Sequence, residues 1–236
     1  MPAQPLPAST PVFPANWASD IIYLTQPFYS RLLDCSTLQQ LCPKPLVRGH
    51  LDTAHPSGPC RSVRIKKITA QDHPAFGQCG LFANQALQPG QWVLDYLGYV
   101  HPASEADQDS DYDLSLDREL QGGVGIDARR MGNEARFVND YRGVPGRVRY
   151  AHVRSGKQRT ATAGPNVVFS ERIVQGTGER RLCIVVGKEK VKKGEELCVS
   201  YGKGFWRERG VVYSGMDWLS QTEHEKFDGG VDVGGK

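Results

Sequence analysis

The residues of this chain whose types and spacing could do chemistry are tyrosine, asparagine and aspartate side chains beside short apolar runs. Tyr201 ends the run 196–201, Tyr112 stands between two aspartates, and Asn139 is followed by Asp140. A tyrosine hydroxyl can orient an amine, and a carboxylate can accept hydrogen bonds from an ammonium group. Taken singly, Tyr201 is more typical of a buried strand tyrosine and Asn139 of a turn residue. Their chemistry therefore depends on whether they fall within ordered motifs.

Metal and nucleophile chemistry are not indicated by the cysteines and histidines. The six cysteines include no C-x-C or C-x-x-C pair, so we expect neither a zinc cluster nor a disulfide framework and interpret them as reduced thiols. Cys79 has no histidine partner implied nearby, and we interpret it as a small apolar filler. The loop histidines show no metal-ligand spacing, so no metal is assigned. These histidines are His50, His55, His73 and His101.

A series of motifs follows in a fixed order along the middle of the chain. The motifs are Q-C-G-L-F-A at 78–83, Y-L-G at 96–98, I-D-A-R-R-M-G-N-E-A-R-F-V-N at 126–139, P-N at 165–166 and K-G-E-E-L-C-V-S-Y-G at 193–202. In this order they resemble the motifs of the SET-domain protein lysine methyltransferases. The third motif is the most specific single match.

The resemblance implies a protein-lysine N-methyltransferase that uses S-adenosylmethionine as the methyl donor. In the family, backbone amides of the first motif line the donor's pocket, the third motif holds the donor's amino-acid end, and the tyrosine of the last motif lies at the methyl-transfer centre. Phe205 and Trp206 stand where the family often has a cysteine-rich zinc segment, and we expect this aromatic pair to close the pocket as a lid. The implied donor-binding residues are Cys79, Gly80, Leu81, Phe82, Arg136, Phe137, Asn139, Asp140, Tyr201, Phe205 and Trp206. The implied catalytic residues are Tyr201 and Tyr112, the latter placed where family members have an aromatic facing the lysine channel.

The chain departs from the family's motifs at several positions. Gln78 stands at the first glycine of G-x-G-L-F-A, and Asp140 replaces the histidine of N-H-S-C, whose cysteine is also missing after Tyr141. A carboxylate at position 140 can still accept from the donor's ammonium group. Residues 137–143 and 200–206 are similar to short fungal SET proteins that lack the cysteine-rich segment.

Methyl transfer requires a deprotonated lysine amine in line with the donor's methyl and sulfur. A lysine amine has a pKa of about 10.4 in a model peptide, and a narrow, poorly hydrated channel beside a sulfonium cation disfavours its charged form. Deprotonation can therefore occur without a strong protein base. Positioning alone can lower the barrier by about 7 kcal/mol in good cases, and a tyrosine hydroxyl with backbone carbonyls suits that role.

Short apolar runs, separated by glycine and proline at intervals too short for crossover helices, predict a β-rich α+β fold of small antiparallel sheets. The resemblance adds the family's pseudoknot, in which residues 136–139 and 194–197 resemble the parts that meet. We predict a domain over 60–206, a short, partly disordered N-terminal extension and linker over 1–59, and a flexible tail over 207–236. The predicted strand runs are 63–68, 92–100, 124–126, 167–174, 182–186 and 196–201. Two stretches, 87–90 and 191–194, share the layout of a tight turn feeding a strand, although turn chemistry alone treats them as unrelated β-turns.

The net charge of +3 conceals two segments of opposite sign. Residues 105–119 carry seven acidic residues against only Arg118. By default this stretch is a solvated loop, but in the family it forms one wall of the substrate groove, where it would favour a lysine- and arginine-rich peptide such as a histone tail. The basic loop 142–159 is most simply a mobile surface insertion, and its alternatives are a contact to nucleic acid or to an acidic patch on a protein.

Two alternatives to an enzyme stay open. One is a SET-like module without turnover that binds a lysine-containing peptide or a chromatin partner, motivated by Gln78 and Asp140. The other is a chromatin or nucleic-acid adaptor that acts through the basic loop and whose binding would fall steeply with salt. No run approaches the roughly 20 apolar residues that span a bilayer, and no secretory signal is present, so we expect a nuclear or cytoplasmic protein without membrane association. The substrate lysine, the number of methyl groups and the oligomeric state stay open.

Overall fold

The structure is a computed structural model that describes most of the chain. The described residues are 13–44, 58–117, 123–145, 148–151, 159–162, 164–202 and 205–206. Residues 1–12 of the predicted N-terminal extension, most of the predicted linker before residue 58 and the predicted tail over 207–236 lie outside these residues, as does part of the basic loop.

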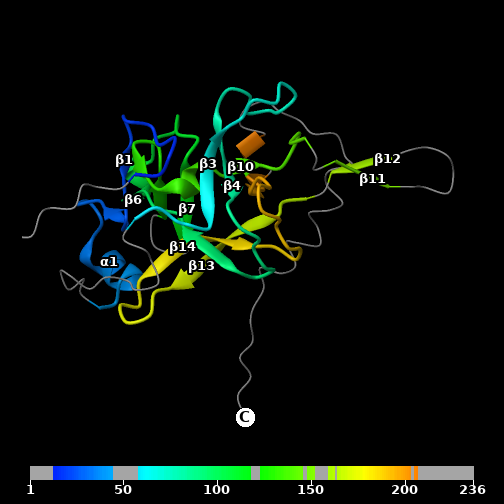
Figure 1. Ribbon diagram of the computed structural model, residues 1–236. Coiled ribbons are helices and arrows are strands. Elements are labelled where there is room, and N and C mark those ends of the chain that lie inside the picture. The colour runs from blue at the N-terminus through cyan, green and yellow to red at the C-terminus, as the bar shows by residue number, and fades with distance from the viewer. Residues whose placement is uncertain are drawn as a thin grey trace, which may run out of the picture.

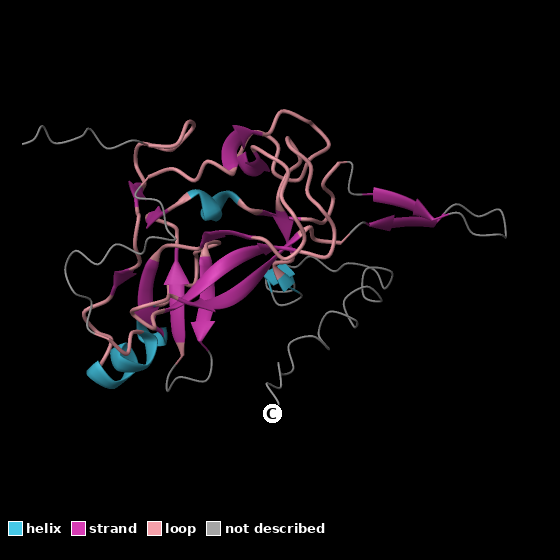
Figure 2. Ribbon diagram, turned by 60° about the horizontal axis from the view of Figure 1, so that its bottom comes forward, coloured by secondary structure: helices cyan, strands magenta, loops and turns pink. Residues whose placement is uncertain are grey.

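Short strands in small sheets dominate the regular structure, which confirms the predicted β-rich fold (Figures 1 and 2). The first strands are β1 (Ile22–Tyr23), β2 (Phe28–Tyr29), β3 (Val63–Lys67), β4 (Cys79–Ala83), β5 (Trp92–Asp95), β6 (Tyr99–Pro102), β7 (Asp113–Asp117) and β8 (Val124–Asp127). They are followed by β9 (Met131–Gly132), β10 (Asn139–Asp140), β11 (Val148–Ala151), β12 (Arg159–Thr162), β13 (Val167–Ile173), β14 (Arg180–Val186) and β15 (Cys198–Val199). Helical segments of the described residues include α1 (Cys35–Leu41) and the 3-10 turns η1 (Ala103–Glu105) and η2 (Glu134–Phe137).

Two larger sheets and several strand pairs surround the main apolar core. The larger sheets have the orders β2-β6-β8-β7 and β13-β14-β5, and β3 pairs with β4 in antiparallel fashion. The core takes side chains from these sheets, since Leu81, Leu94 and Ile126 are each at most 2% exposed. Leucine and β-branched side chains of these strands thus supply the buried apolar surface.

The predicted run 92–100 is divided between two sheets. Its first part is β5, which pairs with β14, and its last part is β6, which pairs with β8. At the crossing point Gly98 lies so close to β8 that a Cβ atom would stand 2.5 Å from the carbonyl oxygen of Asp127. A glycine is therefore required for the chain to change sheets at this point.

Parallel pairing is the main difference from the antiparallel expectation. The N-terminal extension is held to the domain by β1, which pairs with β9, and by β2, which pairs with β6. A third parallel pair joins β10 to β15, and it brings together the two motifs that resemble the parts of the family's pseudoknot. Each of these two-residue pairs joins segments remote in sequence, so local patterns could not predict them.

The helix α1 begins at a side-chain cap and packs onto the core. Asp34 accepts a hydrogen bond from the Thr37 amide at 2.8 Å, which satisfies one of the amides left open at a helix start. Leu33 and Leu41 are buried in the main core, so the extension contributes to the same core as the domain. Across the described residues, the helices are too short and too polar to cross a bilayer.

The two turns that share a layout in the sequence lie side by side. Leu87 and Val191 exchange backbone hydrogen bonds of 2.9 and 3.0 Å. Gly90 and Gly194 complete the turns with φ angles of 72° and 86°, a region that favours glycine. The shared layout thus reflects a spatial pair, and the interpretation as unrelated turns is corrected.

The basic loop contains a β-hairpin that stands away from the rest of the molecule. Strands β11 and β12 pair in antiparallel register from Val148↔Thr162 to Ala151↔Arg159. Figures 1 and 2 both show the hairpin projecting at the end of the molecule opposite α1. Its connecting residues, 152–158, lie outside the described part of the chain.

A network of buried ion pairs joins β5 to β14 and to the extension. Asp95 is fully buried and accepts hydrogen bonds from Arg172, from Arg181 at 3.0 Å and from the Trp92 indole at 3.1 Å. The network continues from Arg181 to Glu179 at 2.6 Å. From there a hydrogen bond of 2.6 Å leads to the Tyr29 hydroxyl on β2.

His101 on β6 is buried with an acceptor at each ring nitrogen. Its Nδ1 lies 2.9 Å from the Pro102 carbonyl, and its Nε2 lies 3.2 Å from a carboxylate oxygen of Asp113 on β7. Both partners can only accept, so the doubly protonated ring satisfies them best. The hydrogen bond to Asp113, with a smaller contribution from Pro102, raises the pKa of His101 against the opposing effect of burial.

We expect this pair to make the free energy of unfolding depend on pH. Because the pKa of His101 is raised in the folded protein, its contribution is fully present below the unfolded value of about 6.5 and is lost as pH rises through the folded pKa. Urea unfolding of wild type and of Asp113→Asn at pH values on both sides of that interval measures this. The variant should show a shallower loss of stability with rising pH, and equal slopes would contradict the expectation.

Candidate functional site

A cavity of about 470 Å³ gathers residues from segments far apart in the sequence. Its size lies within the range of small-molecule sites. The residues that sequence analysis proposed and that line the cavity are Cys79, Tyr112, Arg136, Phe137, Asn139, Asp140, Tyr201, Phe205 and Trp206. The lining residues that sequence analysis did not propose are His73, Pro74, Ala75, Gln78, Asp111 and Arg142.

Three residues proposed from the first motif stand behind the cavity wall. Leu81 is fully buried in the main core, and Gly80 is buried against Glu196. The Phe82 ring lies 4.5 Å from the Lys66 ammonium, on the side of β4 that pairs with β3. Among the proposed residues of this strand, Cys79 thus provides the contact to the cavity, and the others position it.

Tyr201 is held by hydrogen bonds at both its backbone and its hydroxyl. The hydroxyl donates to the Val138 carbonyl at 2.8 Å, and the backbone amide donates to Asp140 at 2.7 Å. Burial, followed by the charge of Asp140, raises the pKa of Tyr201 well above its usual range. The hydroxyl therefore stays protonated and acts as a hydrogen-bonding group, with oxygen lone pairs that can accept from a second donor.

An aromatic cluster surrounds the Tyr201 ring. The Phe205 ring centroid lies 4.7 Å away at an angle of 64°, and the Trp206 ring stacks at 6.3 Å and 19°. Phe205 and Trp206 also contact each other edge to face at 5.1 Å. The pair predicted to form a lid is thus packed directly on the tyrosine.

Asp140 forms a buried clip between Arg142 and the backbone of Tyr201. One carboxylate oxygen accepts from the Arg142 amide at 2.9 Å, and the Arg142 guanidinium contacts both oxygens at 3.0 and 2.8 Å. The second oxygen also accepts from the Tyr201 amide. Each oxygen therefore accepts two hydrogen bonds, which is close to the capacity of a carboxylate. To accept from a donor's ammonium group, Asp140 would have to exchange one of them.

Tyr112 is fixed from both its backbone and its ring. Its carbonyl accepts a hydrogen bond of 2.7 Å from the fully buried Tyr96 hydroxyl. The Arg136 guanidinium lies 4.2 Å from the Tyr112 ring centroid and 4.9 Å from that of Phe137, an arrangement of cation–π contacts. Arg136 also donates to the Ala128 carbonyl at 2.9 Å, so its position does not depend on the rings alone.

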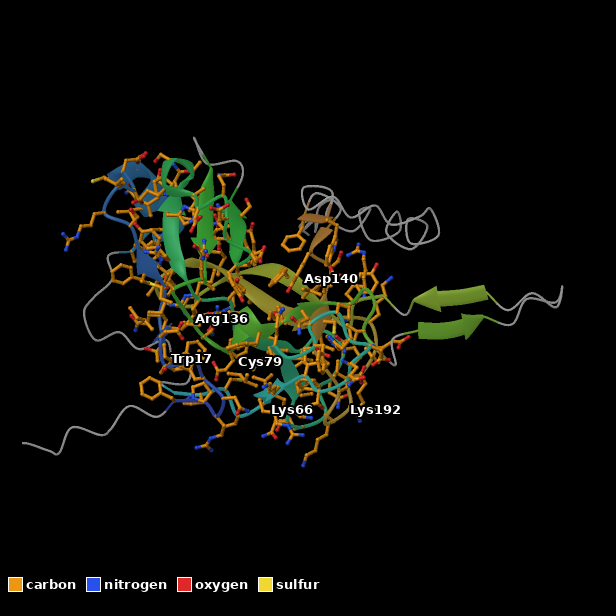
Figure 3. The ribbon with its side chains drawn as sticks, turned by 90° about the horizontal axis from the view of Figure 1, so that it is seen from above. Trp17, Lys66, Cys79, Arg136, Asp140 and Lys192 are labelled. Carbon is orange, nitrogen blue, oxygen red and sulfur yellow. The ribbon has the colours of Figure 1, made fainter. Side chains whose placement is uncertain are left out.

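The N-terminal extension supports the wall formed by η2. Trp17 packs edge to face on Phe137 at 5.7 Å, and the Tyr23 hydroxyl donates to Glu134 at 3.1 Å. Figure 3 labels Trp17, Arg136, Cys79 and Asp140, which lie on four different segments across the middle of the molecule. The extension thus contributes to the site indirectly, by holding η2 in place.

His73 and Arg142 are two of the cavity residues that sequence reasoning missed. His73 was treated as a loop histidine without metal-ligand spacing, and Arg142 as part of the basic loop. Both lie beside recognised motifs, since His73 precedes Gln78 by five residues and Arg142 follows Asp140 by two. That proximity is the signal that could have identified them.

The comparisons with known proteins agree with the arrangement of these motifs. The SET domain family matches residues 78–202. The human (Homo sapiens) histone-lysine N-methyltransferase EHMT1 is 31% identical over 140 residues, which cover 57% of this chain and 9% of that relative. The mouse (Mus musculus) EHMT1 is 29% identical over 150 residues, covering 61% and 10%. The matches therefore span about a tenth of these relatives.

Two of the solved structures that match the chain do so with low TM-scores. KRYPTONITE, crystallised with mCHH DNA, an H3(1-15) peptide and SAH, has a TM-score of 0.40 and 17% identity, over 59% of this chain and 23% of that one. The Chaetomium thermophilum polycomb repressive complex 2 has a TM-score of 0.44 and 20% identity, over 74% and 23%. The family match spans more than half of the 236 residues and includes β10, β15 and Tyr201. This chain belongs to the SET domain family.

Proposed function

We propose that this protein transfers a methyl group from S-adenosylmethionine to a lysine side chain of another protein. The observation that carries the proposal is the cavity, which unites Cys79, Asn139 and Tyr201 from three separate motifs with the aromatic pair Phe205 and Trp206. Membership of the SET domain family and the similarity to histone-lysine N-methyltransferases support it.

The lining residues suit a molecule that has an aromatic base at one end and an amino acid at the other. Phe137, Phe205 and Trp206 offer aromatic surfaces for the base, and the Asn139 amide offers an acceptor for an ammonium group. Arg142, whose guanidinium holds Asp140, adds a positive charge to the cavity wall, and this charge attracts a carboxylate. When bound, S-adenosylmethionine would supply an electrophilic methyl group on a sulfonium.

Tyr201 and Tyr112 are proposed to hold the lysine side chain. The Tyr201 hydroxyl donates to Val138, so its oxygen is left to accept a hydrogen bond from the lysine nitrogen and to direct its lone pair. Because the hydroxyl stays protonated, Tyr201 orients the amine and does not act as its base. The Tyr112 ring, fixed against Arg136, forms one side of the channel and restricts its hydration, and this loss of water disfavours the charged amine.

We further propose a cationic protein segment, such as a histone tail, as the substrate, with the nucleus as the place of action. Asp111 lines the cavity beside Tyr112, while Asp107 and Asp109 lie on the same connection between η1 and β7. An acidic entrance attracts lysine- and arginine-rich segments and speeds their association. The histone-lysine substrates named for the relatives have this chemistry.

The test is titration calorimetry of the full chain with S-adenosylmethionine, followed by transfer of a radiolabelled methyl group to core histones and to a pool of lysine-rich peptides. A matched pool with every lysine replaced by arginine is the control. We expect saturable binding and label on the lysine pool alone.

The outcomes separate the proposed enzyme from its alternatives. No binding at millimolar donor concentrations would overturn the proposal. Donor binding without transfer to any lysine substrate would favour the SET-like binding module. Salt-sensitive binding of nucleic acid that does not respond to the donor would favour the adaptor.

A further inference from the structure

We propose that His73 is a positioning residue that, through Glu196, fixes the side-chain amide of Asn139 for the amino-acid end of the methyl donor. The inference rests on the proposed function, since it concerns how the same cavity would hold that donor. Three residues from separate parts of the chain form the connection. They are His73 in the loop before β4, Glu196 in the segment before β15, and Asn139 on β10.

His73 has a defined tautomer. The residue is only 6% exposed, and its Nδ1 accepts a hydrogen bond of 2.9 Å from the Ala75 amide. A nitrogen that accepts carries no proton, so the proton of the neutral ring lies on Nε2. Nε2 lies 3.0 Å from Glu196 Oε2, to which it donates. His73 thus fixes one oxygen of a carboxylate that is itself only 9% exposed.

Glu196 in turn fixes the orientation of the Asn139 side-chain amide. Its second oxygen, Oε1, lies 2.9 Å from the Asn139 Nδ2 group. An ionised carboxylate can only accept, so the NH₂ end of the amide must face Glu196. The same group lies 3.4 Å from the Cys79 carbonyl, which is also only an acceptor. The amide oxygen is therefore directed away from both, and Asn139 lines the cavity.

The absence of a side chain at Gly80 leaves room for the contact between Glu196 and Asn139. A Cβ atom at position 80 would stand 2.6 Å from Glu196 Oε1 and 3.1 Å from Asn139 Nδ2. The first distance is shorter than a side chain tolerates, so any larger residue would push the carboxylate from the amide. The glycine of the first motif therefore leaves room for the hydrogen bond between the other two motifs.

The hydrogen bonds already made by Asp140 leave the Asn139 amide as the better acceptor for the donor's ammonium group. Because the Asp140 carboxylate already accepts from Arg142 and from the Tyr201 amide, Asn139 is the lining residue of β10 best able to accept from an ammonium group. An asparagine amide that rotated by half a turn would instead present its NH₂ group to that cation. The pair of His73 and Glu196 excludes this rotation.

The test compares two probes on the full chain by calorimetry. S-adenosylhomocysteine has the donor's amino-acid end, whereas 5′-methylthioadenosine keeps the adenosine and the thioether but lacks that end. His73→Leu removes the donor to Glu196, and Glu196→Gln can accept from only one of its neighbours. Both variants should weaken S-adenosylhomocysteine binding by roughly tenfold and leave 5′-methylthioadenosine binding unchanged.

Two further variants identify the role as positioning. His73→Gln keeps an N–H near the place of Nε2 and should restore most of the affinity. Asn139→Ala combined with His73→Leu should bind S-adenosylhomocysteine no more weakly than Asn139→Ala alone, because His73 acts through the amide.

Each other outcome overturns the inference on His73, the proposed function, or both. If wild type binds neither probe, the proposed function and this inference fail together. If wild type binds S-adenosylhomocysteine but His73→Leu keeps the same affinity, this inference fails and the proposed function stands. Equal weakening of both probes shows a general structural role, which also overturns it.

Discussion

The Tyr201→Phe variant is expected to lose at least about a hundredfold in the rate of methyl transfer while it binds the methyl donor as wild type does. The phenyl ring keeps the contacts with Phe205 and Trp206, so the aromatic cluster and the fold should persist. What is lost is the hydroxyl that donates to Val138 and whose oxygen would accept from the lysine nitrogen. Single-turnover rates with labelled donor, beside calorimetry with S-adenosylhomocysteine, measure both quantities.

Tyr99→Phe is the matched control for this prediction. It removes a hydroxyl that hydrogen-bonds Glu105 at 3.0 and 3.1 Å, and Tyr99 is not among the residues that line the cavity. Its transfer rate should stay within about twofold of wild type, as for other changes outside the reacting groups. An unchanged rate in Tyr201→Phe, or equal losses in both variants, would show that Tyr201 does not orient the lysine.

The second large effect is expected on stability, from Asp95→Asn. This change keeps the shape of the side chain but removes the buried charge that Arg172 and Arg181 share. Removing one partner of a buried ion pair destabilises a protein by about 3–5 kcal/mol, because the remaining charges stay desolvated. The Arg181 side chain is 5% exposed and Asp95 is fully buried, so water cannot replace the lost contact. Urea unfolding gives the free energy from the midpoint and the slope.

The control for this prediction is the exposed pair formed by Asp107 and Arg129. Their contact distance of 2.6 Å equals that between Arg172 Nη2 and Asp95, but their side chains are 38% and 42% exposed. Asp107→Asn should therefore change the free energy of unfolding by only about 0–1 kcal/mol. Similar losses in both variants would mean that burial does not determine the strength of the Asp95 network.

The sequence predicts the class of the fold but not the pairing of its shortest strands. The runs at β3, β8, β13 and β14 were predicted because β-branched residues alternate or gather there. The run ending at Tyr201 was predicted over 196–201, but the structure has β15 only at Cys198–Val199. The strand ends early because the Tyr201 amide bonds the Asp140 side chain and not a backbone carbonyl. Such side-chain competition depends on tertiary contacts.

The candidate site could be predicted where its residues belong to motifs and not where they belong to loops. Asn139 and Tyr201 were identified because their neighbours in sequence form ordered patterns. His73 carries no such pattern, and its contact with Glu196 spans 123 positions of the chain. The role of Asp140 was proposed from its place in the motif and from its charge, and its two partners, Arg142 and the Tyr201 amide, become apparent only once the chain is folded.

The clip at Asp140 makes substitutions at positions 140 and 142 depend on each other. A histidine restored at position 140 would remove the carboxylate that the buried Arg142 guanidinium and the Tyr201 amide share. A cysteine restored at position 142 alone would leave the buried carboxylate without its guanidinium. Either single step passes through a less stable protein, since a buried charge loses its partner. The effects of substitutions at positions 140 and 142 are therefore not additive, and exchange of both together should cost less stability than the sum of the single changes.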